Sequence, residues 1–298
     1  MPALIHVGWP KTGTSTLQQH LFPAFGGKDL VGPHSGLFYR FTQDVIQTDD
    51  DRYLAHTWAG FIADARERLP VLIISREDLT KDGRTERIAD RLHALLPDAR
   101  ILACVRNQRT LVPSFYAQHV RDGCPQRFER WLDDNVPRRW HYDIAVDHFQ
   151  ARFGPDRVTV LAFEHLAEDP AGFADSVRAA VLDGEVGPAP GDLPVTNPRA
   201  SRAAHVVSRN LNRLFRSSPW QRDPLVTQLP IRYLRRATRL VERFTPSTAT
   251  GLNEREAARL EALLPSYEAS NARLEALTGL DLGRYGYPLP CGTPARGA

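Results

Sequence analysis

The chain has 298 residues, of which 42% are hydrophobic and 24% charged; these proportions are typical of globular domains and exclude a mostly disordered chain. Its 38 basic and 35 acidic residues give a formal net charge of +3, which does not favour nucleic acid as the main partner. No stretch approaches the roughly 20 consecutive apolar residues of a membrane span. The three cysteines form no C-x-x-C pair, so neither a disulfide framework nor a thiolate zinc site is indicated. Because an apolar run follows Met1 without a basic leader, we expect a cytoplasmic protein.

Short apolar runs alternate with helical patterns along the first part of the chain. The expected strands are residues 3–7, 71–75, 101–105 and 158–163. The expected helices are residues 14–22, residues 51–69 and a helix that starts with Thr85 as its N-cap. Residues 23–50 show no clear period and are expected to form a loop. This βαβ pattern predicts an α/β fold with a parallel sheet covered by helices on both faces.

We expect one domain with two parts. Residues 1–185 form the α/β core, and residues 186–298 form a linker and a helical C-terminal part that helps to wall the acceptor site. The linker is the stretch over residues 184–198, which is rich in proline and glycine. Asn253 and Glu256 have the spacing of a capping box and predict the start of a long final helix.

The most informative segment is a glycine-containing loop between the first expected strand and the first expected helix. It reads Gly8-Trp9-Pro10-Lys11-Thr12-Gly13-Thr14-Ser15-Thr16. A helix N-terminus exposes unpaired backbone N–H groups that attract phosphate-like anions, and Gly13 lets the backbone come close to such an anion. Lys11 adds a full positive charge, and it is one of only three lysines in the chain. We therefore expect this loop to hold a 5′-phosphate.

The loop departs from the nucleotide loop G-x-x-x-x-G-K-[ST]. Gly8 and Gly13 have the correct spacing, but Thr14 stands where that motif has its lysine. This difference disfavours an ATP-dependent small-molecule kinase of P-loop type, which would also need Asp78 as its magnesium ligand. The kinase remains one alternative, and a non-catalytic nucleotide-binding protein is another.

Three segments resemble the sulfotransferase family that uses 3′-phosphoadenosine 5′-phosphosulfate (PAPS). The letters P-K-T-G-T-S of the loop are similar to the family's 5′-phosphosulfate loop. Residues 106–109, with Ser114 eight residues after Arg106, are similar to its 3′-phosphate site. Residues 163–170 are similar to its Y-E-D-L-x-x-D-P segment. The resemblance covers residues 1 to about 185.

This resemblance implies a P-loop NTPase-like sulfotransferase fold, PAPS as co-substrate, adenosine 3′,5′-bisphosphate as product, and no metal. Lys11 would neutralise the leaving group, and Arg106 with Ser114 would hold the 3′-phosphate. The residues that would hold the 5′-phosphosulfate are Lys11, Thr12, Gly13, Thr14, Ser15 and Thr16. Thr16 stands where many cytosolic relatives have a tryptophan against the adenine, which favours the bacterial and heparan-type branch. Gln108 also replaces the family's usual proline.

The expected general base is Glu77. It lies just after the second expected strand, in the segment Ser75-Arg76-Glu77-Asp78, and parallel strands end at the edge of the sheet that binds ligands. Cytosolic relatives have a histidine in this place, whereas carbohydrate-acting relatives use glutamate, from this or another position. Asp78 remains an alternative base, as do four histidines: His20, His34, His56 and His119.

The expected acceptor is a hydroxyl, or less often an amine, on a sugar or another small molecule. Residues 24–50 and 205–250 fit the family pattern least, so we expect them to form the acceptor-binding walls. The arginine-rich residues 201–243 are expected to be helical with breaks. Residues 283–287 are weakly similar to a glycine-rich basic loop that closes over the cofactor in some relatives. The oligomeric state stays open.

Overall fold

A computed structural model describes most of the chain. The described residues are 3–26, 36–80, 83–136, 139–182, 202–219, 221–244 and 252–291. They divide between two compact units that interleave along the sequence. The first unit is 1–107, 140–196 and 267–298, and the second is 108–139 and 197–266. Each of the two parts expected from the sequence therefore contributes residues to both units.

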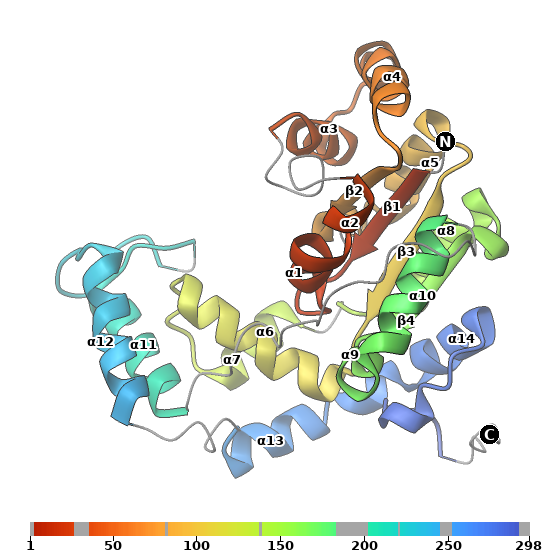
Figure 1. The fold of residues 1–298 in the computed structure, drawn as a ribbon. Coiled ribbons are helices and arrows are strands. Elements are labelled where there is room, and N and C mark those ends of the chain that lie inside the picture. The colour runs from red at the N-terminus through yellow and green to blue at the C-terminus, as the bar shows by residue number, and fades with distance from the viewer. Residues whose placement is uncertain are drawn as a thin grey trace. The chain divides into compact units, whose positions relative to one another are not determined.

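A four-stranded parallel sheet forms the centre of the first unit (Figure 1). Its strands are β1 (Ala3–Gly8), β2 (Leu72–Arg76), β3 (Arg100–Val105) and β4 (Val158–Ala162). All four agree with the predicted strands to within one residue at either end. The strand order is β2-β1-β3-β4, so the direction of winding reverses between β1 and β3. Open α/β sheets bind their ligands at such a switch point, beyond the carboxyl ends of the strands.

Helices cover both faces of the sheet, as predicted. On one face, Leu4, Leu102 and Cys104 pack in one cluster with Phe173 and Val177 of α10 (Pro170–Leu182). Side chains alternate along a strand, so the neighbouring strand residues point to the opposite face. That face is covered by α5 (Thr85–Leu95) and α8 (Tyr142–Phe153), which pack against each other, and α8 also packs on β3 and β4.

The first predicted helix is present but irregular. It consists of α1 (Thr14–Thr16) and a π-helix (Leu17–Leu21), and it is followed directly by α2 (Pro23–Gly26). Leu17, Leu21 and Phe22 join the cluster under the sheet. The anchoring of this segment in the core fixes the end of the glycine-containing loop.

The prediction of a loop over residues 23–50 is wrong for the described part of that range. α2 occupies its beginning, and α3 (Gly36–Gln47) occupies much of the remainder. Phe41, Val45 and Ile46 of α3 are buried at helical spacing, although polar residues between them obscure the period. The next helix, α4 (Asp51–Arg68), agrees with the prediction.

Of the two predicted helix caps, one is wrong and the other is confirmed. The residue before α5 is Arg84, and Thr85 is the first helical residue rather than the N-cap. The capping box of Asn253 and Glu256 is confirmed, with its two hydrogen bonds at 2.9 and 2.8 Å. The prediction of one long helix after this capping box is wrong, because the chain forms two helices there, α13 (Glu254–Glu261) and α14 (Glu268–Thr278). A 3₁₀ turn containing Pro265 separates them, and proline interrupts a continuous α-helix.

The second unit is helical. Besides α13 it contains α6 (Gln108–Asp122), α7 (Phe128–Asn135), α11 (Arg202–Phe215) and α12 (Ile231–Phe244). Trp131 is fully buried between the rings of Phe115, Tyr116 and Phe128. The arginine-rich segment is helical with a break, as predicted, whereas the linker expected at 184–198 lies outside the described residues.

Candidate active site

The carboxyl ends of the strands bring three predicted site residues to one edge of the sheet in the first unit. Lys11 lies in the loop after β1, Glu77 follows β2, and Arg106 follows β3. These residues are up to 95 positions apart in the chain, yet the guanidinium Nη1 of Arg106 donates a hydrogen bond to the Lys11 carbonyl at 2.9 Å. The sheet thus assembles the candidate site that the sequence predicts in separate pieces.

The glycine-containing loop has an unusual backbone held by hydrogen bonds from buried threonines. Lys11 and Gly13 both have positive φ angles, of 71° and 90°. A Cβ atom at Gly13 would lie 3.1 Å from the ring of Phe163, so glycine is needed there for space as well as for conformation. The Thr12 hydroxyl donates to the Trp9 carbonyl at 2.7 Å, and the Thr80 hydroxyl donates to the Gly8 carbonyl at 2.9 Å.

The hydroxyl groups expected to hold a phosphosulfate differ in their burial and in their hydrogen bonds. Thr12 uses its hydroxyl inside the loop, so only its backbone is placed to contact a ligand. The Thr14 side chain is buried, and its hydroxyl has no hydrogen-bond partner among the described residues. Thr16 is buried and Ser15 is exposed. A buried hydroxyl without a partner is costly, and an anion held in the loop would satisfy that of Thr14.

Arg106 is almost fully buried, with 7% of its surface exposed. Its guanidinium lies over the ring of Phe163, 4.7 Å from the centroid. The Tyr142 hydroxyl donates to the Arg106 carbonyl at 2.7 Å, which fixes the turn after β3. A planar, well-oriented guanidinium of this kind is suited to bidentate binding of a phosphate.

Ser114, the predicted partner of Arg106, is half-buried on α6. The helix starts two residues after Arg106, as the resemblance implied, but it belongs to the second unit. The joint action of Ser114 and Arg106 on one phosphate stays a prediction.

Glu77 lies at the start of a 3₁₀ turn (Glu77–Thr80) and is half-buried. Burial raises the pKa of its carboxyl, while the nearby Thr14 hydroxyl and the Lys11 ammonium oppose the rise without cancelling it. The Thr14 hydroxyl is close enough to act on the carboxylate but its geometry gives no hydrogen bond. A carboxylate with a raised pKa beside a cationic loop is suited to accept a proton.

The Asp78 carboxylate interacts with an arginine at the surface rather than with the loop. It is exposed and forms an ion pair with Arg76 at 3.0 Å. Arg76 also donates to the Thr42 hydroxyl at 3.0 Å and lies over the ring of Tyr39. The two neighbouring carboxylates therefore differ: one is tied to an arginine at the surface, and the other faces the loop.

The histidine alternatives have other environments. His56 is exposed on α4, and His34 lies outside the described residues. His119, in the second unit, accepts a hydrogen bond from the Trp131 indole at 2.7 Å, and burial lowers its pKa to about 4. His20 is half-buried in the π-helix, and its Nε2 has no hydrogen-bond partner in the part of the chain that the structure describes.

One buried histidine next to the loop was not predicted. His6 is fully buried in β1, and its Nδ1 lies 2.7 Å from the Ser75 hydroxyl, which also accepts from Gln18 at 3.0 Å. The His6 Nε2 has no partner among the described residues, and both it and the Thr14 hydroxyl lie within 3.3 Å of where a Cβ of Gly8 would be. The only sequence signal was a histidine inside an apolar strand.

His6 predicts a pH-dependent stability. Burial lowers its pKa from 6.5 to about 3, so between these values the unfolded chain binds a proton that the folded chain does not. Stability should therefore fall on acidification below pH 6.5, by about 1.4 kcal/mol per pH unit from this group. We expect urea unfolding at pH 7.5 and 5.0 to show a wild-type loss about 2 kcal/mol larger than that of His6→Gln. Equal losses in the two proteins would mean that His6 is not buried in its neutral form.

Glu164 is a second residue whose role the sequence did not indicate. Its carboxylate accepts from the Asn107 backbone N–H at 3.0 Å and from the Tyr287 hydroxyl at 2.9 Å. The Asn107 side chain in turn donates to the Tyr285 carbonyl at 2.9 Å. Residues 283–287 near the C-terminus thus contact the turn that carries Arg106. The residues joined by these hydrogen bonds are more than 100 positions apart in the sequence.

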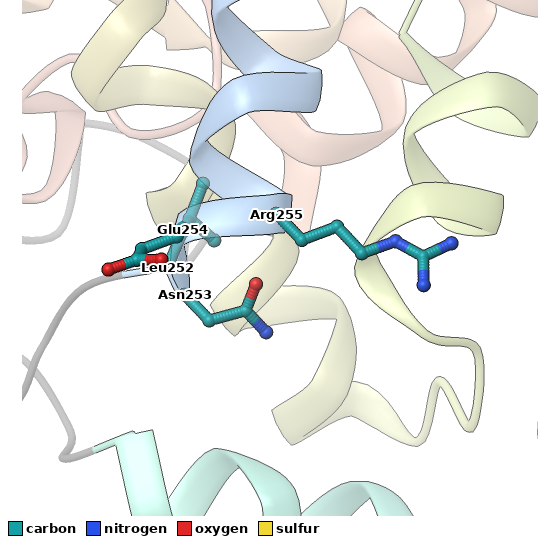
Figure 2. Close-up of a pocket in the computed structure, with 4 residues that line it drawn as sticks. All are labelled: Leu252, Asn253, Glu254 and Arg255. Carbon is teal, nitrogen blue, oxygen red and sulfur yellow. The ribbon is translucent and has the colours of Figure 1, made fainter.

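The pocket in Figure 2 lies apart from these residues in sequence and is not assigned a role. It is open and is lined at the start of α13 by Leu252, Asn253, Glu254 and Arg255. Among the described residues, no group of three or more histidine, cysteine or acidic side chains is arranged to hold a metal ion. No helix in the described ranges is long and apolar enough to cross a membrane.

Comparison with known proteins identifies the family. The structure is similar to that of a sulfotransferase from Alicyclobacillus acidocaldarius. The match covers 71% of this chain and 94% of that one, with 19% sequence identity and a TM-score of 0.46. It also matches the sulfotransferase domain from the curacin biosynthetic pathway, with 13% identity, 97% and 99% coverage of the two chains and a TM-score of 0.39. No curated protein matches it. Residues 34–181, which include Glu77, Arg106 and Ser114, match the family model described as Sulfotransferase family, and the chain belongs to that family.

Proposed function

We propose that this protein transfers a sulfuryl group from PAPS to a hydroxyl, or less often an amine, of a sugar or small-molecule acceptor and releases adenosine 3′,5′-bisphosphate. The observation that carries the proposal is the assembly of the Lys11 loop, Glu77 and Arg106 at one edge of the sheet, with Arg106 bonded to the loop. Family membership supports sulfuryl transfer, and the site supports this donor and a carboxylate base.

The residues at this edge fit a phosphosulfate. Gly13 allows the left-handed backbone of the loop and the close packing of Phe163 against it, and the buried Thr14 hydroxyl has no hydrogen-bond partner among the described residues. Lys11 provides a positive charge in the same loop. Arg106 is oriented by Phe163 and Tyr142, on the turn where the resemblance implies the 3′-phosphate of PAPS.

In the proposed reaction the acceptor oxygen forms a new bond to sulfur while the bond from sulfur to the 5′-phosphate oxygen breaks. Glu77 takes the proton of the acceptor, and Lys11 neutralises the negative charge that develops on the departing phosphate. Both roles depend on positioning and on charge held ready before the reaction. The raised pKa of Glu77 makes it a stronger base than an ordinary carboxylate.

Ligand-induced thermal stabilisation tests the nucleotide site. We expect adenosine 3′,5′-bisphosphate at about 100 times its dissociation constant to stabilise the protein by roughly 2.7 kcal/mol, and AMP at the same concentration to stabilise it less. Arg106→Ala and Arg106→Gln should both lose the preference for the bisphosphate, because the second phosphate is the group that Arg106 would bind. Arg157→Ala is the matched control, since Arg157 is exposed and bonds to the Pro97 carbonyl.

Melting each variant without ligand separates a loss of binding from a loss of folding, because Arg106 also holds the Lys11 carbonyl. Stabilisation by ATP and magnesium in place of the bisphosphate would overturn the proposal in favour of a kinase. Strong bisphosphate binding without turnover over a broad acceptor panel would favour a non-catalytic nucleotide-binding protein.

A further inference from the structure

Positive charge is concentrated in one segment of the second unit. Residues 201–250 contain ten of the 38 basic residues, all of them arginine, but only two of the 35 acidic ones. The rest of the chain therefore has a slight acidic excess. Five of the ten arginines fall within α12, whose sequence is IRYLRRATRLVERF.

One face of α12 is committed to packing inside the unit. Leu234 is buried, and Ala237, Thr238 and Val241 follow it on the same side at helical spacing and are half-buried. The Thr238 hydroxyl lies 2.7 Å from the Ser208 hydroxyl of α11. This contact fixes which side of α12 faces outward.

The outward side of α12 carries two adjacent bands. Tyr233, Leu240 and Phe244 are 51%, 59% and 76% exposed and, at about 100° per residue, align along one side of the helix. The second band runs beside them and is basic; its members are exposed and are Arg232, Arg235, Arg236, Arg239 and Arg243. Leu225 and Val226, in the segment before the helix, are also more than 60% exposed. We call this exposed side of α12 the α12 surface.

We propose that the α12 surface docks on the face of a lipid bilayer that contains anionic lipids. Helices that lie in a membrane interface combine exposed apolar and aromatic side chains with a dense row of basic ones. The apolar band would enter the boundary between headgroups and acyl chains, and the arginines would contact anionic headgroups. Such binding is peripheral and needs no spanning helix.

Two other occupants fit the α12 surface less well. A second copy of the chain using the same surface would bring rows of arginines together, and like charges repel. A sulfated or otherwise polyanionic saccharide would match the arginines, but it would leave Tyr233, Leu240 and Phe244 exposed to water without an apolar partner.

Vesicle flotation with the full chain tests the proposal. We expect the protein to float with vesicles of phosphatidylcholine and phosphatidylserine in a 7:3 ratio, and not with phosphatidylcholine alone. Binding should weaken from 0.05 to 0.5 M salt, because salt screens the charge attraction. Each arginine near an anionic surface contributes about a fivefold factor in affinity, so Arg235→Ser/Arg239→Ser/Arg243→Ser should weaken binding about a hundredfold.

A second variant separates charge from apolar insertion. Leu240→Ser/Phe244→Ser keeps every arginine and should weaken vesicle binding at least tenfold, since both large side chains leave the interface. Arg127→Ser/Arg130→Ser is the matched control, because these exposed arginines belong to the second unit but lie outside α12. Circular dichroism and thermal unfolding confirm that each variant is folded.

Four results would overturn the proposal. If the triple arginine variant bound vesicles as well as wild type, the arginines would make no contribution to binding. If the double apolar variant bound as well as wild type, the apolar side chains would not insert into the bilayer. Retention on heparin without vesicle binding would indicate a polyanionic partner, and a dimer that dissociates in Leu240→Ser/Phe244→Ser would indicate a second copy. Vesicle binding needs no nucleotide, so its failure is distinguishable from failure of the proposed sulfuryl transfer.

Discussion

Lys11→Ala should reduce kcat for sulfuryl transfer by about 10²–10³, the usual effect of removing one group that stabilises developing charge. Lys11 has its backbone locked, with φ at 71° and its carbonyl bonded to Arg106. Its ammonium also lies close enough to Glu77 to lower the pKa of that carboxyl. A lysine whose backbone is fixed here keeps its charge near the reacting groups before the reaction starts, which lowers the cost of reorganisation during transfer.

The same variant has a second expected effect, on the pH dependence. Loss of the Lys11 charge removes one of the influences that lower the pKa of Glu77, so that pKa should rise further. The rising limb of kcat/KM with pH should move to higher pH in Lys11→Ala. Initial rates from pH 5 to 9, with PAPS and an acceptor found by screening, measure both effects.

Lys81→Ala is a matched control for this experiment, because it removes the same charge from outside the loop and outside the expected acceptor-binding walls. It should keep the wild-type rate. A Lys11→Ala protein that is folded and turns over within threefold of wild type would contradict the role assigned to Lys11.

The strands of the sheet were predictable because each is a short apolar run bounded by polar or turn residues. The parallel arrangement followed from the helical segments between them, and the common edge for Lys11, Glu77 and Arg106 followed from the parallel arrangement. Three of the predicted site residues thus came together through topology alone. The binding role of each remains a prediction.

The interactions that hold the site were not predictable in the same way. His6 bonds to Ser75 across 69 positions, and Asn107 bonds to Tyr285 across 178. No local pattern reports such contacts, since they depend on which strands become neighbours and on how the C-terminal residues return. α3 was missed for a related reason: Gly36 and several polar residues weaken its local helical signal, and burial of Phe41 and Val45 decides the outcome.

The sequence favoured Glu77 over Asp78 as the general base, and that role stays a prediction. The structure adds the different surroundings of the two carboxylates, which no local pattern reports. Asp78 forms an ion pair with Arg76 at the surface, whereas Glu77 is half-buried beside Lys11 and Thr14. Asp78→Asn is therefore the natural control for any test of Glu77, because it changes a neighbouring carboxylate of the same charge.

Glu77→Gln should lower kcat by about 10²–10⁴, the range that a positioned general base contributes. The base must be ionised to accept a proton, so the wild-type rate should rise with pH through the raised pKa of Glu77. Glu77→Gln should lose that limb and keep its affinity for adenosine 3′,5′-bisphosphate. Asp78→Asn should keep most of the rate and keep the limb, moved to lower pH because the Asp78 charge is one of the influences that raise the pKa of Glu77. Near-normal turnover by Glu77→Gln would refute the assignment.

Thermal stability provides a second test of Glu77→Gln, because the variant should lose activity without losing stability. Burial disfavours the charged form of Glu77, so a neutral amide of the same shape should leave the melting temperature at pH 7 unchanged or higher. The folded state loses stability from this group as pH rises toward and through its raised pKa, and Glu77→Gln removes that loss. A residue kept for structure would lose stability together with activity. A fall in rate with stability retained is expected only if the charged carboxylate is maintained for the reaction, at a cost to the fold.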